Sequence, residues 1–292
     1  MKNSFNRVLI ATDLSEMDDR LLTFVAQLSK QVKIEKVYLA HIIPNMLVPI
    51  DSELEFHKMF TSGYPIDEKV RDVLKGKSME YFEASDFKVE VEVVEGKAYS
   101  KLLEMVELKE IDLLVVGNKE KSEGSGITAR KIARKAECNV LFVPHSPPEK
   151  IRQILVPIDF SAYSIRALKT AIEWKKDVEV TALNVVNLLL TDQYYGIAMN
   201  PKYRKSVVDN AWEAFYDLQK QPDFKDADFH KDVVINNYSN VSSQLKDYLR
   251  KKDFDLIVMG AKGHSAFENF ILGSVTETFV NIYAAKPILI IR

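Results

Sequence analysis

Glycine and serine residues near the carboxyl-terminal end of the chain have a spacing that suits phosphate binding. The glycines stand at positions 260, 263 and 273, and Ser274 follows the last of them directly. The apolar run 254–259 before them predicts a buried parallel strand, and 275–284 predicts a helix. Glycine lets backbone amides come close to a ligand, and the first amides of a helix have no partner within it. The pattern therefore predicts either a phosphate site or an ordinary loop between a strand and a helix.

A known sequence signature matches this pattern. The stretch resembles the ATP-binding signature of the universal stress protein family, which is matched here by Gly260-x2-Gly263-x9-Gly273-Ser274 and the following Val275-Thr276-Glu277. A Walker loop needs a Gly-Lys-Ser/Thr triplet, and the glycines of the dinucleotide fingerprint lie closer together, so neither motif fits. The resemblance implies ATP as the cofactor, with Mg²⁺ or Mn²⁺ bound through the phosphates rather than by a metal site of the protein.

The resemblance also assigns individual site residues in the second half of the chain. It implies that Asp159 lies against the adenosine, that Val185 contacts the adenine and that Met259 contacts the ribose or adenine. Without it, Asp159 is a turn or helix-start carboxylate, and the other two are core residues. His264 is expected beside the phosphates and not as a catalyst. The predicted ATP-binding set is Pro157, Ile158, Asp159, Val185, Met259, Gly260, Gly263, His264, Gly273, Ser274, Val275 and Thr276.

Two of these residues have hydroxyl groups with two interpretations. Ser274 and Thr276 either donate a hydrogen bond to phosphate or cap the helix that follows. The residue types fit both interpretations, so the sequence does not decide between them.

The elements that must position this site alternate regularly along the chain. In the first half, buried or alternating apolar patterns predict strands over 7–13, 36–43, 88–94, 111–116 and 140–143. Helical spacing predicts helices over 16–31, 67–83, 98–109 and 127–136, with Ser15 as the cap of the first. The connection that ends near Pro65 is long and contains apolar residues, which suggests that it packs on another surface.

The same order of elements begins again in the second half. Strand 153–159 repeats 7–13, strand 179–186 repeats 36–43, strand 254–260 repeats 110–117, and 287–291 closes the chain. Asp13 and Asp159 end equivalent strands 146 positions apart, so the repeat is a whole domain. The prolines of the segment 145–150 mark a linker. The predicted domains are therefore 1–147 and 148–292.

Each domain is expected to be a doubly wound α/β sheet of five parallel strands with helices on both faces. Ligands of such sheets bind beyond the carboxyl ends of the strands, where the strand order reverses. Asp159 and Gly260 both stand at such ends, so they should share one site. The resemblance implies the strand order 3-2-1-4-5 of the nucleotide-α-hydrolase-like fold. It also implies that the closing strands of the two domains pair within one chain and that chains can form a homodimer.

The first half departs from the ATP-binding pattern. Its loop after Gly117 is shorter, Glu120 takes the place of Gly263, and Glu123 adds a second carboxylate. A carboxylate that faces a phosphate is repelled by it. We therefore expect one ATP site per chain, in the second domain. The alternative is that Gly124-Ser125-Gly126 forms a different anion site.

Composition excludes several classes of protein. A formal net charge of −2 over 292 residues gives no basic face for a nucleic acid. Cys138 is the single cysteine, so the chain cannot form an internal disulfide, which points to a reducing compartment. The apolar run near the N-terminus is too short for a signal peptide, and no stretch reaches the length of a membrane span. These features predict a cytoplasmic protein with neither nucleic acid nor membrane as a partner.

Recognisable catalytic sets are missing from the sequence, so a dedicated enzyme is not indicated, and at most slow ATP hydrolysis is expected. Two functions stay open. The first is an ATP-binding stress-response regulator that acts through nucleotide-dependent association. The second is a nucleotide-free interaction scaffold that uses the apolar connections near 46–60 and 187–199.

Overall fold

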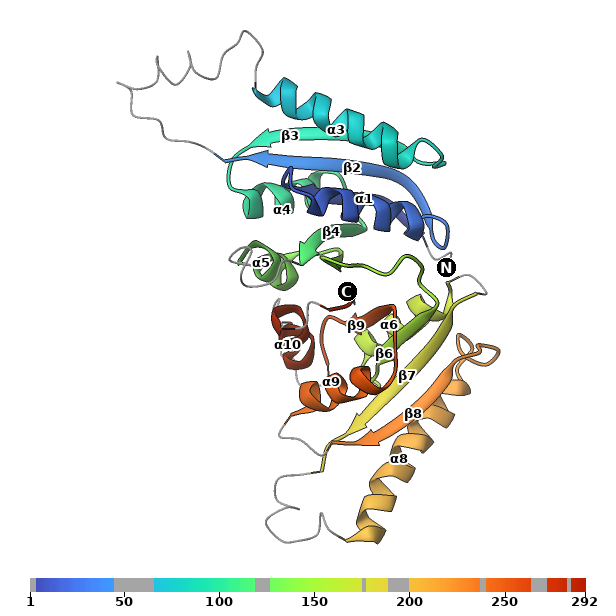
Figure 1. Cartoon of the computed structure of the whole chain (residues 1–292). Coiled ribbons are helices and arrows are strands. Elements are labelled where there is room, and N and C mark those ends of the chain that lie inside the picture. Colours follow the sequence, from blue (N-terminus) through green and yellow to red (C-terminus); the bar gives the residue numbers. More distant parts are fainter. Residues whose placement is uncertain are drawn as a thin grey trace. The chain divides into compact units, whose positions relative to one another are not determined.

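Buried strands alternate with helices in two units of the chain, Ser4–Pro147 (the first unit) and Pro148–Arg292 (the second unit). The computed structural model describes residues 4–44, 66–118, 127–174, 177–188, 200–236, 240–263, 272–282 and 285–292. Figure 1 shows both units and labels most of their elements. Among the described residues, no helix combines the length and the apolar character that crossing a membrane requires.

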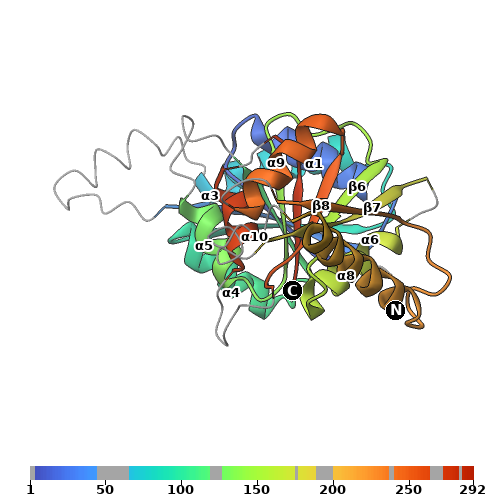
Figure 2. The same cartoon turned by 90° about the horizontal axis from the view of Figure 1, so that it is seen from below.

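The first unit is a parallel sheet with the strand order β3-β2-β1-β4-β5. Helix α1 packs against α3, α4 packs against α5, and Figures 1 and 2 show the two pairs on opposite faces of this sheet. Its strands are β1 (Ser4–Thr12), β2 (Lys33–Ile43), β3 (Lys88–Glu95), β4 (Leu113–Asn118) and β5 (Asn139–Pro144). Its helices are α1 (Met17–Leu28), α3 (Ile66–Phe82), α4 (Ala98–Leu108) and α5 (Ile127–Lys135).

The second unit repeats this arrangement with the order β10-β9-β6-β7-β8 and parallel pairing throughout. Helix α6 packs on β6 and β9, α8 on β7 and β8, and α9 against α10. The strands are β6 (Gln153–Pro157), β7 (Glu179–Val186), β8 (His230–Ile235), β9 (Leu256–Gly260) and β10 (Ile288–Ile291). The helices are α6 (Ala162–Ile172), α8 (Pro201–Gln219), α9 (Val241–Lys251) and α10 (Ser274–Ile282). The predicted fold class and strand order are therefore confirmed.

Burial explains why the central strands could be read from the sequence. Every residue of β9 and β10 is buried, whereas the edge strands β3 and β8 are only half-buried. Strands covered by helices on both faces are apolar throughout, while edge strands keep polar positions. Strand β6 pairs with β9 in parallel, so the carboxyl ends of these two strands lie side by side at the centre of the second sheet.

Two predicted boundaries at the turns after the first strands were wrong. Strand β6 ends at Pro157, before Asp159, because Phe160 turns the backbone to a φ of 63°. Helix α1 has Glu16 at its N-cap position instead of Ser15. The Ser15 hydroxyl instead bonds Asp13 and the Met17 amide. In contrast, Ser161 caps α6 and accepts a hydrogen bond from the Ser164 amide.

Several predictions concern residues outside the described ranges. These are the connection 45–65, the shortened first-half loop with Glu120, Glu123 and Gly124–Gly126, most of the segment 187–199, and His264. They remain predictions.

Candidate functional site

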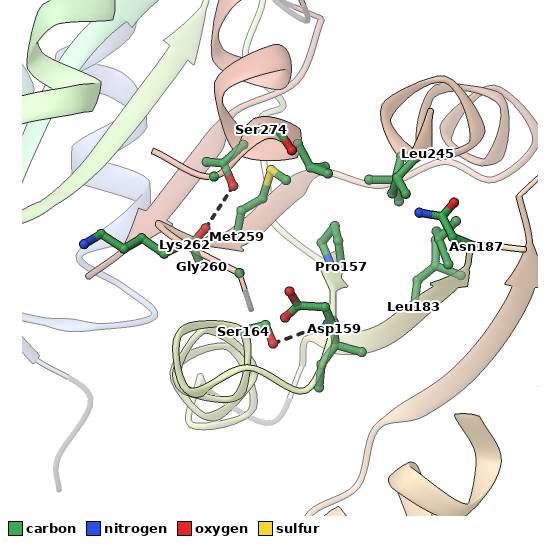
Figure 3. Close-up of a pocket in the computed structure, with 17 residues that line it drawn as sticks. Pro157, Asp159, Ser164, Leu183, Asn187, Leu245, Met259, Gly260, Lys262 and Ser274 are labelled. Atoms are coloured by element: carbon green, nitrogen blue, oxygen red, sulfur yellow. Dashed lines mark hydrogen bonds between the residues drawn. The ribbon is translucent and has the colours of Figure 1, made fainter. Parts of the chain in front are cut away.

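A cavity of about 330 Å³ opens at the carboxyl ends of β6, β7 and β9 in the second unit, and Figure 3 shows it from close by. Strand β6 has β7 on one side and β9 on the other, so this is the point where the strand order reverses. The volume is in the range of small-molecule sites. The lining residues are Pro157, Ile158, Asp159, Ser164, Leu183, Val185, Asn187, Val241, Leu245, Met259, Gly260, Lys262, Gly263, Gly273, Ser274, Val275 and Thr276.

This lining brings together every residue of the predicted set that the structure describes. Eleven of the twelve predicted residues line the cavity, and the twelfth, His264, lies outside the described ranges. The positions predicted from the glycine pattern and the family resemblance therefore converge in space, although they come from three strands, two loops and a helix.

The start of α10 provides unpaired backbone donors to the cavity. The Gly273 carbonyl accepts a hydrogen bond from the Glu277 amide at 2.8 Å, so Gly273 occupies the N-cap position. The next three amides, those of Ser274, Val275 and Thr276, have no hydrogen-bond partner among the described residues. Because all three residues line the cavity, the helix terminus presents a partial positive charge and three donors to it.

Gly263 lies against the carboxylate of Asp159. A Cβ atom at Gly263 would come within 2.5 Å of Asp159 Oδ2. A Cβ at Gly273 would lie 3.4 Å from the Gly263 amide nitrogen. These two glycines thus let the loop, the carboxylate and the helix terminus approach one another.

Close packing against α6 requires a glycine at position 260, in addition to the tight turn that the chain makes at the end of β9. A Cβ there would lie 2.7 Å from the Tyr163 carbonyl carbon and 2.8 Å from the Ser164 amide nitrogen, both in the backbone of α6. The Gly260 carbonyl accepts a hydrogen bond from the Thr276 hydroxyl at 2.9 Å, and Thr276 is buried. The Thr276 hydroxyl proton is therefore engaged within the protein, which leaves Ser274 as the exposed hydroxyl of the pair.

Local hydrogen bonds hold Asp159 at the edge of the cavity. The Asp159 amide donates to Ser164 Oγ at 3.3 Å, and Asp159 Oδ1 accepts from the Ser161 amide at 3.1 Å. Phe160 adopts the left-handed region, which costs a non-glycine residue of the order of 1 kcal/mol or more and often marks a functional site. The turn directs an exposed carboxylate toward the glycine loop.

The other end of the cavity is apolar. Leu183 and Val185 come from β7, and Val241 and Leu245 come from α9. Met259 of β9 also lines the cavity and lies beside Gly260 and Ser274 in Figure 3. Figure 3 shows Leu183 and Leu245 on one side of the cavity and Gly260 and Ser274 on the other. The site can therefore accept a ligand with an anionic end and an apolar end.

The equivalent turn of the first unit has a different side chain. Asp18 stands 146 positions before Ser164, and its two carboxylate oxygens accept the amides of Asp13 at 3.0 Å and Leu14 at 2.9 Å. Leu14 has a φ of 61°, as Phe160 has 63°. Asp18 is buried, and this burial, together with the carboxylate of Asp13, raises the pKa of Asp18 above its ordinary value. The first unit thus places a carboxylate where the second has a hydroxyl.

Sequence reasoning missed six lining residues, which are Ser164, Leu183, Asn187, Val241, Leu245 and Lys262. Lys262 lies between Gly260 and Gly263 of the glycine pattern, and Asn187 lies two residues after the predicted site residue Val185. Their closeness in sequence to predicted site residues could have indicated that both line the cavity. Val241 and Leu245 lie on α9, and only the tertiary fold brings them to the cavity. In the described part of the chain, no cluster of three or more His, Cys, Asp or Glu residues could hold a metal ion.

The fold and the cavity define a class of protein, a tandem of doubly wound α/β units with a helix N-terminus at the switch point of the second sheet. The model of the universal stress protein family matches residues 4–144 and again 150–292. The chain therefore belongs to the universal stress protein family and contains two tandem domains of it.

Individual relatives agree with this assignment. A universal stress protein of Methanocaldococcus jannaschii is 27% identical over 146 residues, which cover 48% of this chain and 82% of that protein. The crystal structure of a universal stress protein from Archaeoglobus fulgidus DSM 4304 matches with a TM-score of 0.69 and 18% identity, over 100% of this chain and 97% of its own. The crystal structure of a protein assigned to the same family, from Pseudomonas aeruginosa UCBPP-PA14, matches with a TM-score of 0.62 and 12% identity. The match covers 99% of this chain and 94% of that protein. At these identities the two structures establish the fold alone.

Proposed function

We propose that the chain binds ATP in its second unit, with Mg²⁺ or Mn²⁺ bound through the phosphates, and acts as a stress-response regulator whose associations depend on the bound nucleotide. Members of the family bind nucleotides. The observation that supports the proposal most is a cavity with apolar side chains at one end and, at the other, three helix amides that have no partner among the described residues.

The groups around the cavity suit the parts of ATP in order. The amides of Ser274, Val275 and Thr276 suit a phosphate chain, because helix N-termini favour anions. Asp159 suits the ribose, whose hydroxyls can donate to a carboxylate. The apolar side chains of β7 and α9 suit the faces of the adenine ring.

A nucleotide-free interaction scaffold is the second candidate function. Exposed apolar residues of α3 in the first unit favour it, since Val73 and Met79 keep 50% and 73% of their surface accessible. Exposed apolar side chains that gather on one element can mark an interaction site. If the chain does not bind ATP, the interaction scaffold is the better supported of the two functions.

The experiment that tests ATP binding uses Gly273→Asp. A side chain at this position lies over the Gly263 amide, and a carboxylate adds a negative charge beside a polyanion. The contacts of the new Cβ begin at 3.4 Å, so the fold should tolerate the change. We expect calorimetric titration to show ATP affinity reduced at least tenfold, which requires only about 1.4 kcal/mol. The melting temperature without ligand should stay close to that of the parent.

Gly76→Asp is the matched control. Gly76 lies on α3 of the first unit, and nothing lies within 4 Å of a Cβ added there. It adds the same charge to the chain, and its ATP affinity should equal that of the parent. Equal ATP affinity of Gly273→Asp and Gly76→Asp would show that the phosphates bind elsewhere.

Three further parts of the proposal come from the sequence and the family resemblance. They are pairing of the closing strands within one chain, assembly into a homodimer and residence in the cytoplasm. Slow ATP hydrolysis is a fourth, and no catalytic residue is proposed for it.

A further inference from the structure

Among the residues that the structure describes, the apolar end of the cavity has one polar side chain. Of the lining residues at β7 and α9, four are apolar, namely Leu183, Val185, Val241 and Leu245, and the fifth is Asn187. Asn187 directly follows the end of β7 and is exposed at the cavity edge. A few placed polar groups in an otherwise apolar pocket usually determine which ligand fits it.

A neighbouring asparagine fixes the orientation of Asn187. Asn236 directly follows β8, and its amide donates to the Val186 carbonyl at 2.8 Å, which holds it beside the end of β7. Asn236 Nδ2 donates to Asn187 Oδ1 at 2.7 Å. The oxygen of Asn187 is thus engaged as an acceptor, while its Nδ2 group has no partner among the described residues. In Figure 3 the nitrogen of Asn187 lies on the side of Leu245 and the cavity.

We propose that Asn187 binds the base of the nucleotide by donating a hydrogen bond from Nδ2 to an acceptor atom on the base edge, with Asn236 as its positioning residue. This inference rests on the proposed ATP site. The helix amides of α10 fix the phosphate end, so the base is directed to the opposite, apolar end where Asn187 lies. The three ring acceptors of adenine outside the glycosidic bond are N1, N3 and N7, and one of them is the expected partner.

Two substitutions separate the donor from the shape of the side chain. Asn187→Ala removes both polar atoms, and ATP affinity should fall about two- to tenfold, the range of one neutral hydrogen bond. Asn187→Asp keeps the oxygen that accepts from Asn236 and replaces the donor by a second oxygen, so the loss for ATP should be larger. Inorganic tripolyphosphate, which has no base, should bind the parent and Asn187→Ala equally. Asn210→Ala is the matched control, because Asn210 is an exposed asparagine of α8 outside the cavity lining.

Analogues of ATP identify the acceptor atom. We expect one of 1-deaza-, 3-deaza- and 7-deaza-ATP to bind the parent as weakly as ATP binds Asn187→Ala, and to lose nothing further in that variant. Asn236→Ala should weaken ATP in the parent and have no effect when combined with Asn187→Ala, because it acts through Asn187.

The experiments distinguish failure of the proposed ATP site from failure of the inference about Asn187. If the parent does not bind ATP at all, the proposed function fails and this inference fails with it. If the parent binds ATP, the inference alone is overturned by equal ATP affinity of Asn187→Ala and the parent, by an equal loss of tripolyphosphate binding, or by parent-like binding of all three deaza analogues.

Discussion

Ser164 and Asp18 occupy equivalent places in the two units, and both accept hydrogen bonds from amides of the turn beside them, but only Asp18 has a carboxylate. Ser164 Oγ accepts the Asp159 amide at 3.3 Å and lines the cavity. In the first unit the buried Asp18 carboxylate accepts hydrogen bonds from the backbone amides of Asp13 and Leu14, so both amides of the turn have a partner within the protein. This is a second reason, independent of the predicted loop with Glu120, to expect ATP in the second unit alone.

Ser164→Asp should reproduce the first-unit turn in the second unit. The fold should tolerate the change, because Asp18 makes two amide hydrogen bonds at the same position of an equivalent turn. Because Ser164 lines the cavity, the added charge would lie near the bound nucleotide, and a pair of like charges costs on the order of a few kcal/mol at close range. We expect ATP to bind at least ten times more weakly than to Ser164→Asn, which has the same shape without the charge. Equal affinities of the two variants would exclude this account of the turn.

At the scale of elements, Gly117 near the end of β4 and Gly260 at the end of β9 are equivalent but have different neighbours. A Cβ at Gly260 meets the backbone of α6 at 2.7 Å, whereas a Cβ at Gly117 meets the Met17 side chain at 2.8 Å. A side chain can change rotamer, but a helix backbone must move as a whole. The same substitution should therefore have unequal effects in the two units.

Gly260→Ala should lower the stability of the second unit by about 1–3 kcal/mol, the usual range for overpacking. Gly117→Ala should lower that of the first unit by less, because the Met17 side chain can rearrange. Differential scanning calorimetry of the whole chain checks this. Equal shifts, or a larger shift for Gly117→Ala, would mean that the contact with α6 does not limit the packing.

A charge network joins three elements of the first unit. Lys36 of β2 pairs with Glu90 of β3 at 2.5 Å, and Lys109, which follows α4, pairs with Glu92 at 2.5 Å. The hydrogen bond from Lys36, and then that with Glu92, lowers the pKa of Glu90 from 4.5 to about 2. Because the folded-state pKa is the lower one, the stabilisation by Glu90 is present above about pH 4.5 and is lost as the pH falls toward about 2.

Glu90→Gln should therefore make the first unit less sensitive to acid. The Glu90 side chain is 41% exposed, so solvent screening limits the contribution to less than about 1 kcal/mol. We expect the melting temperature of the parent to fall more between pH 6 and pH 3 than that of the variant. Glu83→Gln, at an exposed position just after α3, serves as the control and should behave as the parent does. Parallel curves for parent and Glu90→Gln would contradict the assignment.

The sequence predicted those elements whose physical signal is local. Buried strands such as β9 are continuous apolar runs, and the glycines mark where backbones approach each other. The contributions of α6 and α9 to the cavity were not predictable, since Ser164 and Leu245 have no pattern that points to a ligand. Nor does a sequence reveal that the Thr276 hydroxyl is used by Gly260, or that Asp18 is buried against two amides. Those facts depend on tertiary contacts.

At the scale of the whole molecule, duplication gives two units of one fold with different turns. The second unit has the cavity at the start of α10, while the first has a buried carboxylate at the turn equivalent to that of Asp159. A ligand that binds one unit stabilises that unit by an amount set by its concentration relative to Kd, about 2.7 kcal/mol at a hundredfold excess over Kd. The two units would then respond differently to the same nucleotide.

Calorimetric titration of the full chain with ATP in the presence of Mg²⁺ tests the central claim most directly, because it counts sites. The account predicts one ATP per chain, with binding weakened in Gly273→Asp and Ser164→Asp. Two equivalent sites would show that the first unit binds ATP despite Asp18, and the absence of binding would remove the nucleotide from the account.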